Sequence, residues 1–160
     1  MENFTQFKTR VIEYLSGLTA FADVAVIPAY IEKPKAFPLK NPVISVEIAG
    51  AELSAAGLGG YVGGDSPQYG MTALVTLKFG IYHTQAELCG KLFESLCDVL
   101  FSSPVAGVLK IRRRESLYDA KAAAHLLYAE ADLKAVWVAG GAEERLFENI
   151  QIMNQDVISK

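Results

Sequence analysis

The chain begins with apolar positions spaced as in an amphipathic helix. Over residues 3–19, five apolar side chains recur every three or four positions, with polar residues between them: Phe4, Phe7, Val11, Leu15 and Leu18. Since an α-helix completes one turn in about 3.6 residues, this spacing places them on one face. The pattern predicts a helix whose apolar face packs on a sheet.

Alternation of apolar and polar positions predicts two strands. In residues 44–48 apolar and polar positions alternate, which is typical of a half-buried strand. The inward side chains of this strand would be Ile44, Val46 and Ile48. Residues 71–82 repeat the alternation over a greater length, and their inward face would carry Ala73, Val75, Leu77, Phe79 and Ile81. A shorter strand is expected at 23–31, where Pro28 requires an edge position or a break. The prolines of 33–42 predict an extended connector.

A second helix is expected after residue 83. Thr84 and Glu87 match a capping box, in which hydroxyl and carboxylate satisfy each other's free backbone donors. The helix would extend to about Phe101, and Pro104 follows its end. Its buried stripe would consist of Leu88, Leu92, Leu96, Val99 and Leu100.

Two long strands, at residues 107–118 and 125–138, are expected to form a hairpin. One face of the second strand would carry Leu127, Ala129, Ala131, Leu133, Ala135 and Trp137. The order of helix, strands, helix and strands predicts an α+β fold, a mostly antiparallel sheet with two main helices on one face. The length fits a single domain over 1–160. Residues 143–160 would form a C-terminal extension, whose spacing fits either a helix or a strand.

Glycine dominates the segment before the strand at 71–82. Residues 54–70 contain six glycines and no clear period. A dinucleotide fingerprint beginning at Gly57 would need a glycine where Val62 stands, and no phosphate-loop lysine follows. We therefore expect a long, flexible Gly-rich insertion at 57–70 that orders on a partner. Its contact residues would be Gly59, Gly60, Tyr61, Gly63, Gly64 and Asp65.

Composition and charge argue against several classes of protein. The formal net charge is −3, with both signs interspersed, whereas a dedicated nucleic-acid binder usually carries a basic patch. Cys89 and Cys97 would lie about 12 Å apart along the second helix. That separation is too long for a disulfide, so both are expected to be small apolar residues in a reducing compartment. No signal peptide and no membrane span are expected.

No constellation of residues indicates catalysis or metal binding. His83 and His125 are the only histidines, and each is isolated in the sequence. Gly64–Ser66 resembles an esterase nucleophile block, but Ala122 stands where the Asp-x-x-His pair of such enzymes would need its aspartate. We expect neither enzymatic activity nor a cofactor.

The run Arg112-Arg113-Arg114 is the sharpest charge feature. On an alternating strand, Arg112 and Arg114 share one face and Arg113 lies on the other. One interpretation places Arg112 and Arg114 on a surface that contacts DNA phosphate or an acidic partner. The other pairs them across the hairpin with Glu130 and Asp132.

Short sequence patterns in this order resemble a known family. The patterns are NPVISVEIAG (41–50), GLGGYVGGD (57–65), ALVTLKFGIYHT (73–84), RRRESLYDAKAAA (112–124) and HLLYAEADLKAVWV (125–138). They are similar to small tail proteins encoded by phages and prophages of Gram-positive bacteria, in particular to the tail-terminator group (tail completion, head-to-tail joining). The resemblance covers most of residues 3–138.

The resemblance implies a structural role without a cofactor. Tail terminators form a ring, commonly a hexamer, that caps the tail tube and presents a surface to the neck of the capsid. The implied partners are further copies of the chain, the tail tube protein and a neck or head-completion protein. The implied location is the host bacterial cytoplasm during assembly and then the virion tail. By analogy, the insertion at 57–70 would reach a partner ring or the lumen. Arg112 and Arg114 would lie at a subunit contact, or along a channel with incidental contact to passing DNA.

Two alternatives remain open. The chain could be another neck or tail-associated virion protein of the same fold class. It could also be a small-molecule-binding α+β domain whose site lies under the Gly-rich insertion, lined by Tyr61, Asp65 and Tyr82. The sequence offers no converging set of acids and bases to support the second alternative.

Overall fold

The computed structural model describes four ranges of the chain: 3–28, 39–56, 61–62 and 68–139. The chain forms two compact units. The larger unit contains Asn3–Glu52 and Leu74–Ala135, and the smaller one contains Leu53–Ala73 and the chain from Val136 onward. Three long strands each contribute residues to both units.

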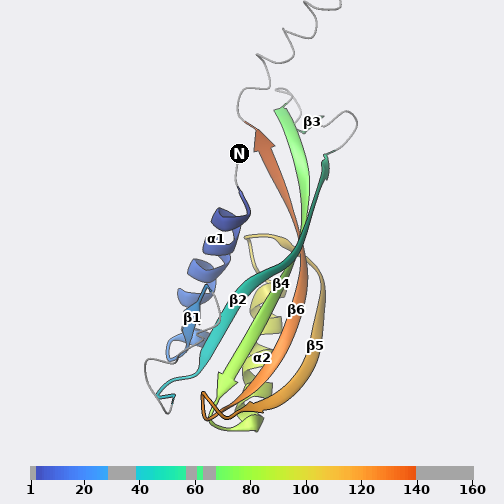
Figure 1. Cartoon of the computed structure of the whole chain (residues 1–160). Coiled ribbons are helices and arrows are strands. Elements are labelled where there is room, and N and C mark those ends of the chain that lie inside the picture. Colours follow the sequence, from blue (N-terminus) through green and yellow to red (C-terminus); the bar gives the residue numbers. More distant parts are fainter. Residues whose placement is uncertain (1–2, 29–38, 57–60, 63–67, 140–160) are drawn as a thin grey trace, which may run out of the picture. The chain divides into compact units, whose positions relative to one another are not determined.

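One sheet organises the described residues (Figure 1). Its strands lie in the order β1 (Ala25–Ile27), β2 (Val43–Ala55), β4 (Gln68–His83), β6 (Ala124–Ala139) and β5 (Gly107–Asp119). β1 pairs with β2 in parallel, whereas β5 pairs with β6 antiparallel. Figure 1 shows β2, β4 and β6 running in alternate directions. The sheet is therefore mixed and mostly antiparallel, and the expected α+β class is confirmed.

Alternation along the central strands builds the core of the larger unit. On β4 the predicted inward row is at most 1% exposed: Val75, Leu77, Phe79 and Ile81. β6 contributes a second buried row, as predicted: Leu127, Ala129, Ala131, Leu133 and Ala135. Removing this apolar surface from water is the dominant stabilising contribution to the fold.

The first helix, α1, spans Phe4–Ser16. The Asn3 side chain accepts the backbone N–H of Gln6 at 2.9 Å, and the Gln6 side chain accepts the N–H of Asn3 at 3.0 Å. This reciprocal capping box satisfies two backbone donors that the helix leaves unpaired. The helix is shorter than predicted, because Leu18 instead precedes the 3₁₀ turn Thr19–Phe21. Its predicted apolar face is buried at Phe7, Val11 and Leu15.

The second helix, α2, spans Ala86–Phe101 and begins without the predicted capping box. Gln85 is the N-cap residue, and its side chain makes no capping hydrogen bond. Instead the imidazole of His83 accepts the backbone N–H of Gln85 at 3.0 Å, and the hydroxyl of Thr84 lies 3.4 Å from the same nitrogen. The prediction from Thr84 is wrong because His83, one residue earlier, provides the side-chain acceptor.

The two helices contact each other directly. The hydroxyl of Tyr14 in α1 donates a hydrogen bond to the carbonyl of Val99 in α2 at 3.2 Å. Of the predicted stripe on α2, Leu96 and Leu100 are fully buried, and Cys89 is buried with them. The placement of both helices on one face of the sheet stays a prediction.

Residues 43–46 of β2 are buried on both faces, so the prediction of a half-buried strand is wrong for this part. Ile44 and Val46 are fully buried as expected, but Val43 and Ser45 are only 8% and 5% exposed. A second, smaller apolar cluster covers this other face: Val43, Tyr82 and Leu126, with Ile27, Leu39 and Tyr128 packed against them. Side chains from distant segments supply this cover, which the alternation within residues 43–48 cannot reveal.

Gly80 permits a close approach of β4 to β2 beneath this cluster. A Cβ atom at position 80 would lie 2.6 Å from the Ser45 hydroxyl oxygen and 3.2 Å from the ring of Tyr82. The Ser45 hydroxyl donates to the carbonyl of Gly80 at 3.5 Å. No side chain larger than hydrogen fits here without displacement of its neighbours.

In the smaller unit, part of the predicted Gly-rich insertion at 57–70 belongs to strands. The backbone of Tyr61–Val62 forms β3, which pairs antiparallel with Gln68–Tyr69 of β4. Two paired residues on each strand are too short a run for apolar alternation to reveal. Residues 57–60 and 63–67 lie outside the described residues.

β1 ends at Ile27, directly before Pro28, and is an edge strand as that proline requires. The predicted connector and the C-terminal extension fall largely on 29–38 and 140–160, which lie outside the described residues. In the part that is described, no helix is long and apolar enough to cross a membrane.

Two glycine substitutions should have opposite effects on stability. Gly80→Ala should lower the unfolding free energy by about 1–3 kcal/mol, because the added methyl group collides with Ser45 and Tyr82. Gly90→Ala on α2 should raise it by about 0.5–1 kcal/mol, because a Cβ there meets nothing within 4 Å. Urea unfolding of both variants measures this, and a neutral Gly80→Ala would contradict the tight packing.

Candidate subunit-contact surface

The candidate surface is the hairpin of β5 and β6, whose strands the alternation predicts correctly. β5 pairs with β6 only, because it is the last strand in the described sheet. Irregularities in register interrupt the ladder between Val108 and Lys110 and again between Arg113 and Ser116. Bulges of this kind bend and twist an edge strand, and they are among the features by which proteins limit uncontrolled pairing.

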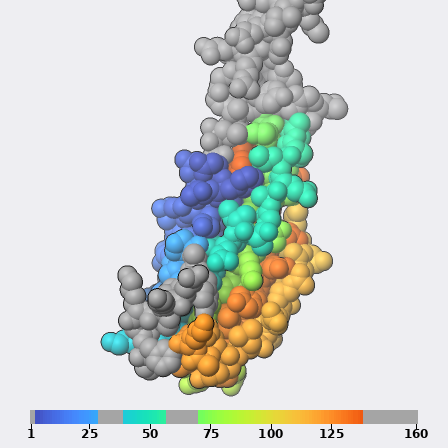
Figure 2. All heavy atoms as spheres, viewed as in Figure 1, coloured from blue at the N-terminus to red at the C-terminus, as the bar shows by residue number. Residues whose placement is uncertain are grey.

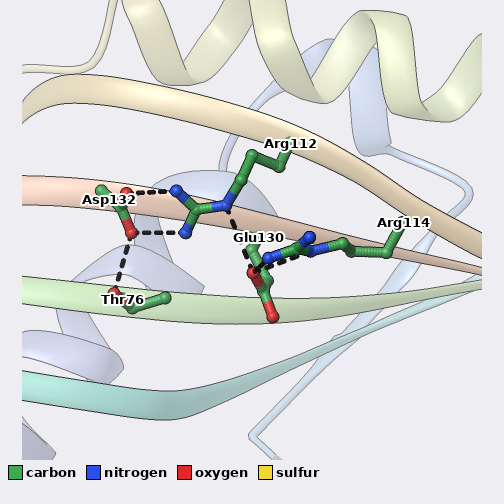
Figure 3. Close-up of polar contacts among 5 residues, drawn as sticks. All are labelled: Thr76, Arg112, Arg114, Glu130 and Asp132. Carbon is green, nitrogen blue, oxygen red and sulfur yellow. Dashed lines mark hydrogen bonds and ion pairs between the residues drawn. The ribbon is translucent and has the colours of Figure 1, made fainter.

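Arg112 and Arg114 form an ion-pair network with the facing strand (Figure 3). The guanidinium of Arg112 donates two hydrogen bonds to the carboxylate of Asp132, at 2.5 and 2.8 Å, and one to Glu130 at 3.3 Å. Arg114 donates two to the same Glu130 oxygen, at 2.9 and 2.6 Å. The hydroxyl of Thr76 in β4 donates to Asp132 at 2.8 Å. The predicted pairing across the hairpin is confirmed.

The network favours the charged form of every member whose pKa it shifts. Hydrogen bonds from Arg112 lower the pKa of Asp132, and those from Arg114 lower the pKa of Glu130. The hydrogen bonds to Asp132 raise the pKa of Arg112 in turn. Two positive charges are thus balanced by two negative ones. Little net charge is left here to attract DNA phosphate or an acidic partner.

Arg113 lies on the opposite face of β5, and the sequence interpretation left it out of the contact residues. It pairs in register with Ala129, whose side chain is fully buried in the core, while Arg113 itself is exposed. No hydrogen bond or ion pair joins its guanidinium to any described residue. The alternation already separated it from Arg112 and Arg114, but the sequence could not show that only these two are neutralised.

Arg113 lines a hollow of about 320 Å³, which we call the Arg113 hollow. The hollow lies between the first turns of α2 and the end of the hairpin, and its other polar side chains are Ser116, Tyr118 and His125. The rings of Tyr118 and His125 meet edge to face, with centroids 5.1 Å apart. Leu117 and Tyr118 at this site are 41% and 58% exposed.

Cys89 also lines the Arg113 hollow but is not suited to nucleophilic chemistry. Its thiol lies 3.6 Å from the carbonyl oxygen of Ile81 and 3.4 Å from that of His125, and its single S–H can donate to either of them. Burial raises the pKa of Cys89, which lowers the fraction of reactive thiolate. The side chain is 2% exposed, as expected for a small core residue, whereas Cys97 is half-buried.

A second hollow, of about 480 Å³, lies beside the ion-pair network, and we call it the Glu52 hollow. Its lining includes Gly50, Glu52, Leu74, Thr76, Leu109 and Asp132. Leu74 and Leu109 are 37% and 58% exposed, and Glu52 is exposed as well. The hollow therefore combines an acidic side chain with apolar surface that remains in contact with water.

The residues predicted in the Gly-rich insertion are not brought into a site. Gly59, Gly60, Gly63, Gly64 and Asp65 lie outside the described residues, and for Tyr61 only its backbone position in β3 is described. Tyr82, expected to line a ligand site with Tyr61 and Asp65, is 5% exposed within the smaller apolar cluster. Across the ranges that the structure describes, no group of His, Cys, Asp or Glu could hold a metal ion.

Asp132→Asn should reduce the loss of stability in acid. Because Arg112 holds the pKa of Asp132 below its usual value of about 4, the carboxylate stabilises the fold at neutral pH. That contribution disappears as the pH falls through the lowered pKa. The unfolding free energy of the wild type should therefore decline more in acid than that of the variant. Urea unfolding over a pH series measures this, with Glu94→Gln, on the exposed side of α2, as the control that keeps the wild-type profile.

Comparison with known proteins leaves the family of the chain open. No family model matches the chain, and no curated protein matches it. Any function must therefore be argued from the hairpin and its two hollows, together with the resemblance in element order and short patterns.

Proposed function

We propose that the chain is a structural subunit of a phage or prophage tail, a tail terminator whose copies assemble into a ring. The ring, of about six copies by analogy with the family it resembles, would cap the tail tube and join it to the head. The observation that carries this proposal concerns strand β5. It is a long edge strand whose large apolar side chains remain exposed.

β5 has thirteen residues, Gly107–Asp119, and no other described strand pairs with its outer side. In Figure 2 its gold atoms form one margin of the larger unit. Leu109, Leu117 and Tyr118 are 58%, 41% and 58% exposed along this strand. Apolar side chains concentrated on an open edge favour contact with another polypeptide, and a neighbouring subunit would cover them.

The helices support an assembly with a distinct inner and outer side. We propose that α1 and α2, joined by the hydrogen bond from Tyr14 to Val99, cover one face of the sheet. The other face, which carries the ion-pair network, would then be available to a neighbouring ring or to the lumen. Because Arg112 and Arg114 are already paired, any contact of this face with passing DNA would be incidental.

The proposed neighbours are the tail tube protein on one side of the ring and a neck or head-completion protein on the other. The subunits would assemble in the cytoplasm of the host bacterium and remain in the virion tail. The work of such a subunit is binding, and the proposal requires neither a catalytic residue nor a cofactor. A small-molecule site under the Gly-rich insertion gains no support, since Tyr82 is packed in the smaller apolar cluster.

The purified chain should form a closed ring, seen as one dominant high-mass species by native mass spectrometry and as annuli by negative-stain microscopy. Leu109→Ser on β5 should shift this species toward monomer, because it removes exposed apolar area from the edge strand. Phe101→Ser is the matched control, because Phe101 is 64% exposed but lies at the end of α2. A wild-type chain that remains monomeric at every concentration would contradict the proposal.

A further inference from the structure

Of the three consecutive arginines of β5, two are held in ion pairs and one is not. Arg112 and Arg114 are held by Glu130 and Asp132, whereas Arg113 makes no hydrogen bond or ion pair with any described residue. The hydroxyl of Ser116, in the same hollow, is likewise without a partner among the described residues. An exposed guanidinium with adjacent donors and an apolar border is suited to bind a carboxylate.

The Glu52 hollow has the complementary composition. Glu52 is exposed and has no hydrogen bond or ion pair with the rest of the described chain. Leu74 and Leu109 border it with exposed apolar surface, as Tyr118 borders Arg113. Each hollow thus presents one unpaired charge, of opposite sign, beside exposed apolar surface. Interfaces commonly combine buried apolar contacts with charge complementarity of this kind.

We propose that Arg113 of one copy binds Glu52 of the next copy, with the exposed leucines of the Glu52 hollow packing against Tyr118. This contact rests on the proposed ring and identifies the two surfaces that form it. The guanidinium would donate to the carboxylate, and the apolar borders would exclude water from the pair.

The two surfaces are different, which decides the symmetry of the contact. Arg113 lies in register with Ala129 on the core face, whereas Asp132, three residues further along β6, lies on the opposite face with Thr76. An interface between two different surfaces is heterologous, so repetition generates a ring or a filament rather than a two-fold dimer.

The position of Arg113 also opposes the simplest competing contact, a two-fold pairing of β5 with itself. β5 spans Gly107–Asp119, and Arg113 is its middle residue. An antiparallel pairing centred on the strand would place Arg113 of one copy against Arg113 of the other. Like charges directly opposite each other on adjacent strands are destabilising.

A protein carboxylate suits the Arg113 hollow better than DNA phosphate does. Binding to the DNA backbone depends on several cations that each neutralise a phosphate. The adjacent arginines are internally balanced, Glu115 is the next residue but one along β5, and the net charge of the chain is −3. A single guanidinium beside an apolar border is suited to one carboxylate.

A charge exchange tests the contact. Arg113→Glu and Glu52→Arg should each weaken ring formation by about tenfold or more, since either variant places like charges together. The double variant Arg113→Glu/Glu52→Arg should restore the ring, because it recreates the pair with its polarity reversed. Native mass spectrometry and sedimentation velocity report the oligomer, and thermal unfolding establishes that each variant is folded. Lys121→Glu, exposed in the turn between β5 and β6, is the control and should leave the ring intact.

The outcomes separate this inference from the proposed function. A wild-type ring that persists in either single variant, or that the double variant fails to restore, would overturn the Arg113–Glu52 contact and leave the ring standing. A wild type that never assembles would overturn both. Binding of a labelled DNA duplex, measured in parallel, should be unaffected by Arg113→Glu. If that variant lost DNA binding but kept the ring, phosphate would be the occupant of the hollow and the contact would be wrong.

Discussion

The pairing register between β5 and β6 determines what the charged side chains of this sheet can do. With Arg112 opposite Glu130, the guanidinium also reaches Asp132, and Arg114 donates to the same Glu130 oxygen as Arg112 does. The same register places Arg113 opposite Ala129, on the face where the hairpin has no carboxylate to offer. A slip by one residue would exchange the faces, exposing two arginines and directing one toward the carboxylates. Backbone pairing thus determines that Arg112 and Arg114 are held in ion pairs within the sheet, whereas the charge of Arg113 remains available to another molecule.

Much of the fold could be predicted because burial here follows strict periodicity. The inward row of β4, from Val75 to Ile81, and the alternating row of β6 are buried as their patterns indicate. The prediction for residues 43–46 was wrong because it depends on contacts between distant segments. Residues 43–46 are covered on their second face by Tyr82 and Leu126, which lie far away in sequence. The start of α2 depends on the imidazole of His83, and β3 on backbone pairing within glycine-rich sequence. The periodic spacing of apolar side chains, on which the predictions rest, does not reveal any of these three contacts.

The candidate surface could be predicted only in part, because the sequence does not show which arginine side chains reach a carboxylate. Sequence alternation correctly placed Arg112 and Arg114 together and offered Glu130 and Asp132 as partners. It could not establish whether the guanidinium groups reach those carboxylates, because this depends on twist and on bulges in the ladder. The two arginines that were predicted as contact residues, Arg112 and Arg114, are therefore the pair whose charges the fold neutralises. Arg113, which was not among the predicted contact residues, retains the unpaired charge.

Some features of β5 oppose backbone pairing with another strand, whereas others favour the burial of its apolar side chains by another surface. Register irregularities between Val108 and Lys110 and between Arg113 and Ser116, with a positive charge at the middle of the strand, oppose extended backbone pairing, particularly between two identical edges. Leu109, Leu117 and Tyr118 nevertheless leave apolar area that is stabilised when another surface covers it. A strand with both properties resists indiscriminate sheet extension yet accepts a complementary surface. An acidic hollow bordered by leucines meets this requirement, and since it differs from the surface around Arg113, the proposed association would propagate from copy to copy.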